Sequence, residues 1–561
     1  MAPWSRAVLL AVAGLTALPT FALSASGSPA AAKGCTTDRP AAPFHSDGRA
    51  ALGAAVVVPC ATTTQYGGSE SHIRVAPDGT VVVEPALVTL GLPSYMQSGL
   101  ATTGNSGTSW QLLQYNGTLS QPNDNAIYID RTSGRLYVVL SAGLGVDIAG
   151  ETQLLTAQPS AQGYGHWAVT TMHGFAGSEN SRFTSAPAPA GQPAPADGGP
   201  VGYWCGNRNP VGTSPPIIDR ECYRTLDGGV SWQQRSILYK VAVASHPECG
   251  SSDEQFGAGD GSYPQGAADG SLWLAIDCGG TTYLARSTDE AASFPILRTA
   301  GGAPLTIPST AAAAAQTGLG ALGGARHELR VDSDGNLYVA QAVGSALLVR
   351  ISRDRGATWS KPLNLTAPKA RGDAAVYQWA FAVGHAGQVA AAYLVPRSGG
   401  GWDGYVSATH DALSADPLIY GGAMNAPAAA IVSKSAVGDD YIDVDVGPDG
   451  TAWAAFYADC PGGSADAFCA KAPTYAVPTQ FQGNEQVGPQ AEVVGRLAFP
   501  TSGAAAPLAD RAPTSAPRTP TRPRGSLAAT GVAALVPVVA AALLTVAAVA
   551  RRAGRRRSAA D

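Results

Sequence analysis

Residues 72–83 read HIRVAPDGTVVV, and this stretch decides the fold. Apolar residues alternate with other residues on both sides of Asp78-Gly79, which is the strongest short-range signal for a β-hairpin. The pattern returns at residues 329–339 (LRVDSDGNLYV) and 442–453 (IDVDVGPDGTAW). Related turns lie at Gly134, Gly270 and Gly387. The chain therefore repeats one hairpin-based unit.

The spacing of the turn glycines predicts how many units there are. From Gly79 to Gly450 the successive glycines are separated by 55, 136, 65, 52 and 63 residues. The separation of 136 equals about two units, so the spacing gives seven units of roughly 50–70 residues.

A second motif follows the same period and has the pattern S/T-x-D/N-x-G-x-x-W. Clear copies span residues 103–110, 225–232 and 352–359, residues 287–294 lack the glycine, and residues 409–411 are a remnant. The hydroxyl and the acidic or amide group can bond the loop backbone, and glycine supplies positive φ. The aromatic residue fills the apolar layer. These structural residues are Asn105, Trp110, Asp227, Trp232, Asp289, Phe294, Asp354 and Trp359.

The motif resembles the Asp-box, or BNR repeat, of sialidase-like β-propellers of secreted bacterial type. Residues 203–205 with 221–224, and residues 438–441, look like further parts of that family, so the resemblance covers about residues 66–500. It implies an all-β propeller, with seven blades favoured. Six blades are the alternative if residues 140–200 are an insertion, because residues 185–200 look more like loop than strand. In the family, the Asp-box residues lie on the face away from the active site.

The same resemblance implies candidate catalytic residues. Sialidases use three Arg on the substrate carboxylate, a Tyr nucleophile activated by a Glu, and an Asp as acid/base. Arg74 matches the first Arg, although the usual Arg-Ile-Pro is broken, and Tyr441 matches the nucleophile. The second and third Arg have no recognisable setting. The catalytic candidates are Arg74, Tyr441, Glu328 and Asp440.

The strand before each Asp-Gly turn is expected to be the innermost strand of its blade, so its polar residues can line the central channel. The binding candidates on this ground are His72, Tyr263, His327, Arg330, Trp379 and Asp443. Residues 439–445 contain four Asp whose oxygens suit calcium, but the alternation of Ile442, Val444 and Val446 favours a strand. We therefore predict no metal site and no cofactor, with calcium as the alternative.

The composition excludes some classes of function. Only 14% of the 561 residues are charged, while 67 are Gly and 41 are Pro, which favours many tight turns over a helical bundle. The last eleven residues hold five Arg and one Asp, so they carry +4 of the formal charge of −5 and the preceding chain carries −9. An acidic body has no long-range attraction for phosphate backbones, which argues against nucleic-acid binding.

The two ends of the sequence predict where the protein is located. Residues 1–25 read as a secretory signal peptide, with Arg6 before an apolar run and small residues at 22–25. Residues 26–65 are an N-terminal segment, and residues 501–526 are a Pro/Ala/Thr/Arg-rich spacer.

Near the C-terminus, residues 527–531 (LAATG), an apolar stretch at 532–550 and a basic tail at 551–561 together resemble a sortase sorting signal. The resemblance implies cleavage between Thr530 and Gly531 by sortase and attachment to peptidoglycan on a Gram-positive cell, with the basic tail left in the cytoplasm. The alternative is a transmembrane tail anchor that is never cut.

The eight cysteines agree with export, since disulfides persist in secreted proteins. They fall as neighbours along the chain, and the candidate pairs are Cys205 with Cys222, Cys249 with Cys278, Cys460 with Cys469, and Cys35 with Cys60.

These observations predict a wall-displayed propeller that contacts an extracellular carbohydrate or protein ligand. One alternative is an exo-sialidase or related glycoside hydrolase acting on terminal acidic sugars. A second alternative is a purely structural surface protein.

Overall fold

The computed structural model describes the body of the chain between residues 42 and 499. The described residues are 42–54, 56–64, 71–84, 88–89, 96–97, 100–113, 122–142, 151–160, 163–173, 175, 182–208, 219–240, 263–278, 281–308, 327–372, 376, 378–398, 400–425, 431, 442–459 and 490–499. The signal peptide, the spacer and the sorting signal predicted above lie outside this range. No helix among the described residues is long and apolar enough to cross a membrane.

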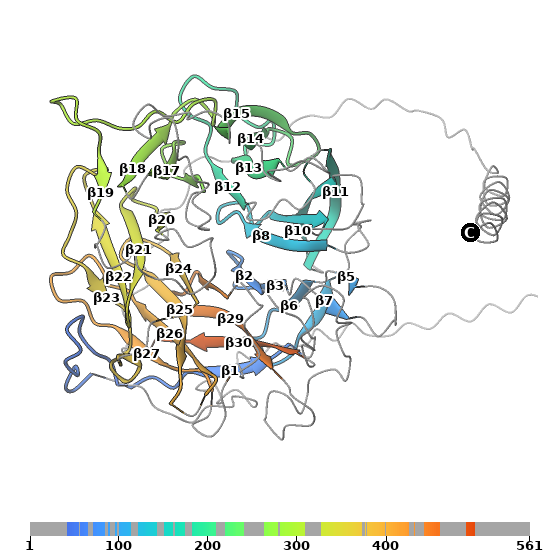
Figure 1. Ribbon diagram of the computed structural model, residues 1–561. Helices are drawn as coiled ribbons and strands as arrows, with labels where there is room; N and C mark the ends of the chain where they lie inside the picture. Colours follow the sequence, from blue (N-terminus) through green and yellow to red (C-terminus); the bar gives the residue numbers. More distant parts are fainter. Residues whose placement is uncertain are drawn as a thin grey trace, which may run out of the picture. The chain divides into compact units, whose positions relative to one another are not determined.

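Seven four-stranded antiparallel sheets are arranged as the blades of a propeller (Figure 1). Blade 1 contains β2 (His72–Val75), β3 (Val81–Glu84), β6 (Leu100–Thr103) and β7 (Gln111–Leu113). Blade 2 contains β8 (Pro122–Ile129), β9 (Leu136–Ala142), β10 (Glu151–Ser160) and β11 (Gly163–His173). Blade 3 contains β12 (Arg182–Ala186), β13 (Val201–Arg208), β14 (Asp219–Thr225) and β15 (Gln233–Lys240).

The ring continues through four further blades. Blade 4 contains β16 (Gln265–Gly266), β17 (Leu272–Cys278), β18 (Thr281–Ser287) and β19 (Thr306–Ile307). Blade 5 contains β20 (Glu328–Val331), β21 (Leu337–Val343), β22 (Ala346–Ser352) and β23 (Leu363–Asn364). Blade 6 contains β24 (Trp379–Val383), β25 (Val389–Pro396), β26 (Trp402–Thr409) and β27 (Tyr420–Ala423). Blade 7 contains β28 (Asp443–Val446), β29 (Ala452–Asp459), β30 (Gln490–Leu497) and β1 (Cys60–Thr63).

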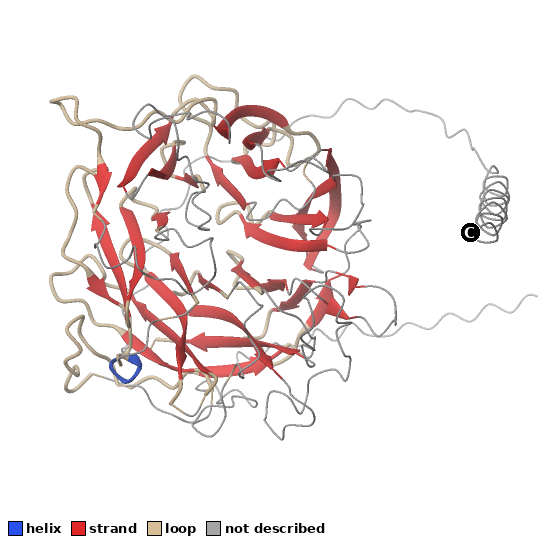
Figure 2. Ribbon diagram, in the orientation of Figure 1, coloured by secondary structure: helices blue, strands red, loops and turns tan. Residues whose placement is uncertain are grey.

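The fold is therefore an all-β seven-bladed propeller, as predicted. Strands make up nearly all the regular structure, and the single helical element among the described residues is the short 3₁₀ turn η4 (Pro368–Ala370) (Figure 2). A small extra hairpin pairs β4 (Val88–Thr89) with β5 (Met96–Gln97).

Blade 7 closes the ring with a strand from the other end of the chain. β1 supplies its outermost strand, antiparallel to β30, with Cys60 opposite Arg496 and Thr63 opposite Val493. This closing strand precedes residue 66, where the sequence resemblance begins. Upstream, Phe44 exchanges backbone hydrogen bonds with Ile419 beside blade 6, so the N-terminal segment fastens two successive blades.

The first strand of each blade is its innermost strand. Around the ring, β2 contacts β8, and contacts follow in order through β12, β16, β20, β24 and β28 back to β2. The core lies between the blades, where Ile73 and Val75 of blade 1 pack against Trp453 and Val494 of blade 7. Both faces of most blades are buried in this way, which explains near-continuous apolar strands such as β9.

The separation of 136 residues between Gly134 and Gly270, twice the usual spacing, does correspond to two blades. β10 and β11 complete blade 2, so the alternative in which residues 140–200 are an insertion into six blades is wrong. Residues 187–200 form the strand-free connection between β12 and β13, and Gly198 in it has φ +73°.

Five turns with Asp or Asn at one position connect the third strand of a blade to the fourth, and four of them share one hydrogen-bond pattern, while the fifth keeps only the Thr409–Asp411 part of it. In blade 5, Ser352 donates to Asp354 at 2.8 Å and accepts from the N–H of Gly356 at 2.7 Å, while Asp354 accepts from the N–H of Thr358 at 2.8 Å. The copy at residues 287–294 keeps this geometry without its glycine, because Ala291 takes φ +63°. The fifth turn is centred on Asp411. All five carboxylate or amide groups are thus used by the turns themselves.

One predicted disulfide is present among the described cysteines. Cys205 and Cys222 face each other in register on β13 and β14 and are bonded. Cys60 is disulfide-bonded as well. Cys35, Cys249, Cys460 and Cys469 lie outside the described residues.

Candidate functional site

The innermost strands of the last and first blades are joined by one buried carboxylate. Asp443, the first residue of β28, accepts hydrogen bonds from the N–H of Ile73 at 3.2 Å and from Nδ1 of His72 at 3.3 Å. It also forms an ion pair with the Arg74 guanidinium. His72, Arg74 and Asp443, three of the residues proposed from the sequence, therefore meet at the seam between blades 7 and 1.

A second carboxylate repeats the arrangement one step further along. Asp445 accepts from the N–H of Val75 at 2.9 Å and from NH2 of Arg131 at 2.7 Å. Alternate residues of β28 thus bond alternate N–H groups of β2, so the two inner strands run parallel and in step. Asp443 and Asp445 are occupied by donors, and no group of carboxylates, His or Cys among the described residues could hold a metal ion. The calcium alternative at residues 439–445 has no geometric support here, although Asp439 and Asp440 are not among the described residues.

The charged groups at this seam shift one another's pKa values. Burial would raise the pKa of Asp443, but Arg74 and His72 hold it well below its usual range. Burial lowers the pKa of His72, and the positive charge of Arg182 adds to that effect against the opposing influence of Asp443. The imidazole is therefore neutral at neutral pH.

Arg182 brings a second cationic group close to the same seam. It is the first residue of β12, and its charge acts on both His72 and Arg74. Its guanidinium carbon lies 5.4 Å from the ring centre of Tyr263, and that of Arg220 lies 4.7 Å from the same ring. Arg220 NH2 is also 3.4 Å from the Tyr263 hydroxyl. Tyr263 and Arg220 are buried, whereas Arg182 and Arg74 are only partly so.

The candidates on β20 form a separate group. Glu328 pairs with NH2 of Arg330 at 3.1 Å. The preceding residue, His327, has Nδ1 3.2 Å from the Thr282 hydroxyl. No ion pair between described residues joins this group to the one around Arg74. Trp379, on β24, is buried.

Two functional candidates from the sequence, Asp440 and Tyr441, lie outside the described residues. Conversely, sequence reasoning missed Arg182 and Arg220. Arg220 stands directly before Glu221-Cys222 in the motif used for the family resemblance, and Arg182 opens an inner strand that the six-blade alternative treated as part of an insertion. Counting seven inner strands first would have drawn attention to Arg182.

A further buried acid lies in the closing blade. Glu492 on β30 is fully buried, and neither of its carboxyl oxygens has a hydrogen bond of good geometry. Burial raises the pKa of Glu492 to about 8, and the Ser71 hydroxyl opposes the rise only in part. This acid is uncharged at neutral pH.

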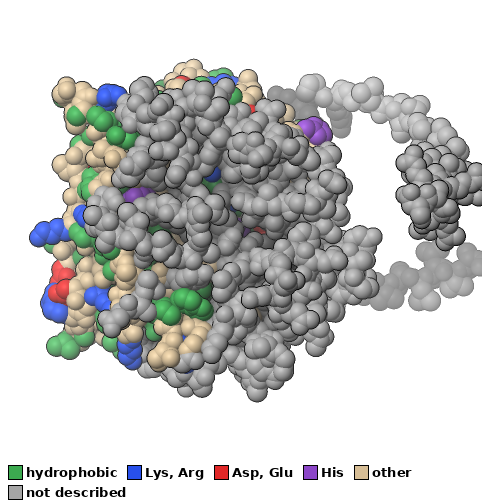
Figure 3. Space-filling view, in the orientation of Figure 1, with side chains coloured by type: hydrophobic (Ala, Val, Ile, Leu, Met, Phe, Trp, Pro, Cys, Tyr) green, Lys and Arg blue, Asp and Glu red, His purple; other side chains and the backbone are tan. Residues whose placement is uncertain are grey.

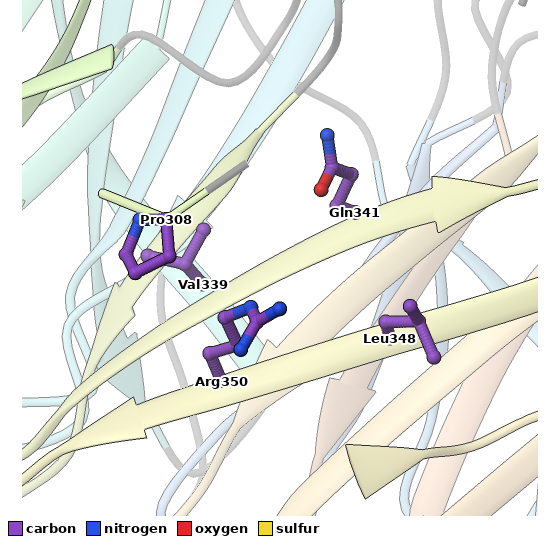
Figure 4. A pocket seen from close by; sticks show the side chains of 5 residues that line it. All are labelled: Pro308, Val339, Gln341, Leu348 and Arg350. Atoms are coloured by element: carbon purple, nitrogen blue, oxygen red, sulfur yellow. The ribbon is translucent and has the colours of Figure 1, made fainter. Parts of the chain in front are cut away.

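A small hollow at blades 4 and 5 brings together a different set of residues. It is lined by Pro308 after β19, by Val339 and Gln341 of β21, and by Leu348 and Arg350 of β22 (Figure 4). None of the residues proposed from the sequence lines it.

Among known proteins, the chain is similar to solved structures. The NanB sialidase from Streptococcus pneumoniae is similar with 13% identity and a TM-score of 0.34, over 70% of this chain and 65% of that chain. The phage phi92 endosialidase has 9% identity and a TM-score of 0.37, over 87% and 79% of the two chains. Polysaccharide lyase Uly1 has 10% identity and a TM-score of 0.39, over 82% and 98%.

The chain thus spans just under two thirds of the NanB sialidase. No protein-family model and no curated protein sequence matches the chain.

Proposed function

We propose that this propeller binds the anionic group of an acidic carbohydrate in its channel. The observation that carries the proposal is that Arg74 and Arg182 stand on the inner strands of blades 1 and 3 and are close enough for the charge of Arg182 to act on Arg74. Both residues are partly exposed, and each has a contact that positions it, Arg74 with Asp443 and Arg182 with the Tyr263 ring. Planar guanidinium groups are well suited to a carboxylate because they can bond it in a bidentate manner.

The surroundings of the pair support a fixed geometry. Arg220 packs on the same Tyr263 ring, so two guanidinium groups contact one aromatic side chain. A pre-formed cationic wall binds an anion without the cost of ordering long side chains at the moment of binding.

The test is the binding of monosaccharides to the full-length protein. We expect N-acetylneuraminic acid and glucuronic acid to bind and neutral galactose not to bind, as measured by ligand-observed NMR. Arg182→Gln should weaken binding by about 10- to 100-fold, the range for loss of a charge-assisted hydrogen bond. Arg49→Gln is the matched control, because Arg49 is exposed on the N-terminal segment.

Equal binding by the Arg182→Gln variant, or equal binding of galactose, would refute the proposal. A fluorogenic sialoside provides the second arm. Turnover that is lost in Tyr441→Phe would replace simple recognition by glycoside hydrolysis.

We also propose that the protein is displayed on a Gram-positive cell wall. The support is the order of LAATG at 527–531, the apolar stretch at 532–550 and the Arg-rich tail, with a signal peptide at the opposite end. Sortase and peptidoglycan are then its first partners. Thr530→Ala should move the protein from the wall fraction to the membrane fraction, and an unchanged distribution would count against sortase processing.

A further inference from the structure

The inner hairpins of blades 1, 4, 5 and 7 share one turn, which allows their residues to be compared by position. In blade 5 the N–H of Asp332 donates to the carbonyl of Asn336, and the N–H of Gly335 donates to the carbonyl of Asp332. The same two bonds recur in the other three blades, where the turns begin at residues 76, 267 and 447. The residue two positions before each turn therefore stands at the same depth of its inner strand.

The residues at this depth are Arg74 in blade 1, Gln265 in blade 4, Arg330 in blade 5 and Asp445 in blade 7. Asp445 is buried and bonded to its neighbours, as described above. The other three remain partly exposed although they lie on the innermost strands. Among the described residues, blades 1, 4 and 5 thus supply polar groups to one level of the channel wall.

The two parts of this wall differ in charge. Around the seam of blades 7 and 1, the two guanidinium groups of Arg74 and Arg182 act on each other beside one carboxylate, Asp443. On blade 5 the single guanidinium of Arg330 is balanced by Glu328 at 3.1 Å. The first part therefore suits an anion, and the second suits polar groups without a charge. Figure 1 shows β2 and β20, which carry these two parts, on different sides of the centre of the ring.

The outer surface does not separate charge in this way. Figure 3 shows Lys and Arg side chains beside Asp and Glu along the described edge of the molecule. Two of the ion pairs outside the channel are Arg286 with Asp269 at 2.6 Å and Arg397 with Asp403 at 3.4 Å. The inner strands are therefore the better place to look for specificity.

Gln265 and Arg330 complement each other as hydrogen-bonding groups. The Nε2 of Gln265 is 3.4 Å from the carbonyl of Tyr263, while its amide oxygen accepts no hydrogen bond from a described residue. Arg330 supplies only donors, and two of its nitrogens are directed to the carbonyl of Leu329 and to Glu328. A sugar hydroxyl both donates and accepts, so it matches an amide oxygen next to a guanidinium group.

The amide lies within one sugar ring of the cationic side. Tyr263, whose ring contacts Arg182, stands two residues before Gln265 along the same extended segment. Two extended residues span at most about 7 Å. A sugar that binds Arg182 through its anionic group can therefore place hydroxyls at Gln265.

We propose that Gln265 and Arg330 bind the hydroxyl groups of the sugar whose anionic group is bound by Arg74 and Arg182. This inference rests on the proposed binding of an acidic carbohydrate in the channel, and it defines the ligand class more closely. The ligand then carries both an anion and a hydroxylated ring. A site built to bond a hydroxyl disfavours an analogue without it, because its own polar groups are left unpaired.

The experiment compares two acids by ligand-observed NMR on the full-length protein. Glucuronic acid has a hydroxylated six-membered ring, whereas cyclohexanecarboxylate has the same ring size and carboxylate but no hydroxyls. We expect glucuronic acid to bind at least about tenfold more tightly. Gln265→Leu removes the amide at nearly constant size, so it should weaken glucuronic acid about three- to tenfold and leave cyclohexanecarboxylate unchanged. The matched control Gln192→Leu, at a partly exposed position in the connection between β12 and β13, should change neither affinity.

A second variant makes the test independent of a single substitution. Arg330→Gln/Glu328→Gln exchanges the balanced ion pair for two amides and keeps the net charge. It should also weaken glucuronic acid and leave cyclohexanecarboxylate unchanged. Unfolding temperatures near that of the wild type would show that the variants are folded.

The outcomes separate this inference from the proposed function. Equal affinity for the two acids, or an equal loss of both in Gln265→Leu, would overturn the inference while the anion site stands. Binding of neither acid, or no effect of Arg182→Gln on either, would overturn the proposed function and this inference with it.

Discussion

Replacement of Glu492 by Gln should stabilise the protein, and more strongly as the pH rises. Glu492 lies on β30 in the seam that closes the ring, fully buried, where the next residue on its face, Val494, packs against Ile73 of blade 1. Its amide counterpart has the same shape and no charge to lose. The substitution therefore isolates the free energy that is lost because the buried carboxyl group must stay protonated.

The magnitude follows from the shift in pKa. Burial raises the pKa of Glu492 from 4.5 to about 8. A raised pKa in the folded state gives stability that is complete below pH 4.5 and is lost as the pH rises towards 8, because the unfolded chain releases the proton first. At about 1.4 kcal/mol per pH unit, Glu492 costs roughly 2 kcal/mol at pH 6 and up to about 5 kcal/mol at pH 8.

The assay is thermal or urea unfolding of wild type and Glu492→Gln at pH 4, 6 and 8. We expect the two proteins to agree at pH 4 and to diverge steadily above it, with the variant the more stable. Asp334→Asn, at an exposed position in the blade 5 hairpin turn, controls for the loss of one negative charge. Parallel stability curves for wild type and Glu492→Gln would refute the assignment of a buried, uncharged acid.

Four further substitutions test the turns and the seam. Gly229→Ala and Gly335→Ala impose the same positive φ on Ala, but the new Cβ would lie 2.3 Å from Thr156 in the first and meet nothing in the second. Gly335→Ala should therefore cost about 1–2 kcal/mol and Gly229→Ala some 1–3 kcal/mol more, by urea unfolding. Ser352→Ala removes the acceptor for the N–H of Gly356 and should cost about 1–2 kcal/mol, measured in the same way. Because the pKa of Asp443 is depressed, its contribution is present above pH 4 and fades in acid, so Asp443→Asn should destabilise at pH 7 and approach the wild type near pH 2.

The fold could be predicted because its signals are local. Two motifs carry these signals: an Asp-Gly turn between two alternating strands, and a turn held by its own hydroxyl and carboxylate. Each motif needs only neighbouring residues, so about a dozen consecutive residues are enough to recognise it. The copy at residues 287–294 shows how far such a signal survives, since Ala291 keeps the left-handed conformation that glycine takes elsewhere. The closing strand was harder to see, because β1 pairs with a strand more than 400 residues away in sequence.

The site could be predicted only where a candidate lay before a recognised turn. His72, Arg74 and Asp443 precede Asp-Gly turns, and they meet. Arg182 precedes the long connection 187–200, in which the Asp197-Gly198 turn comes eleven residues after β12 ends, and so its place on an inner strand was not recognised. Glu492 carries no sequence signal at all, since a lone acid in a strand reads as a solvent-facing residue until its neighbours are known.

The direction of the inner strands also determines towards which face of the propeller Arg182 lies. β28 and β2 run parallel and in step, as the bonds from Asp443 and Asp445 to alternate N–H groups require. In blade 7, β30 ends at Leu497 opposite Ala452, two residues after the Asp449-Gly450 turn, so this strand ends on the face of these turns. Arg182 begins its strand and therefore lies towards the opposite face. A ligand that contacts Arg182 from the beginning of β12 thus approaches from the face opposite the Asp-Gly turns.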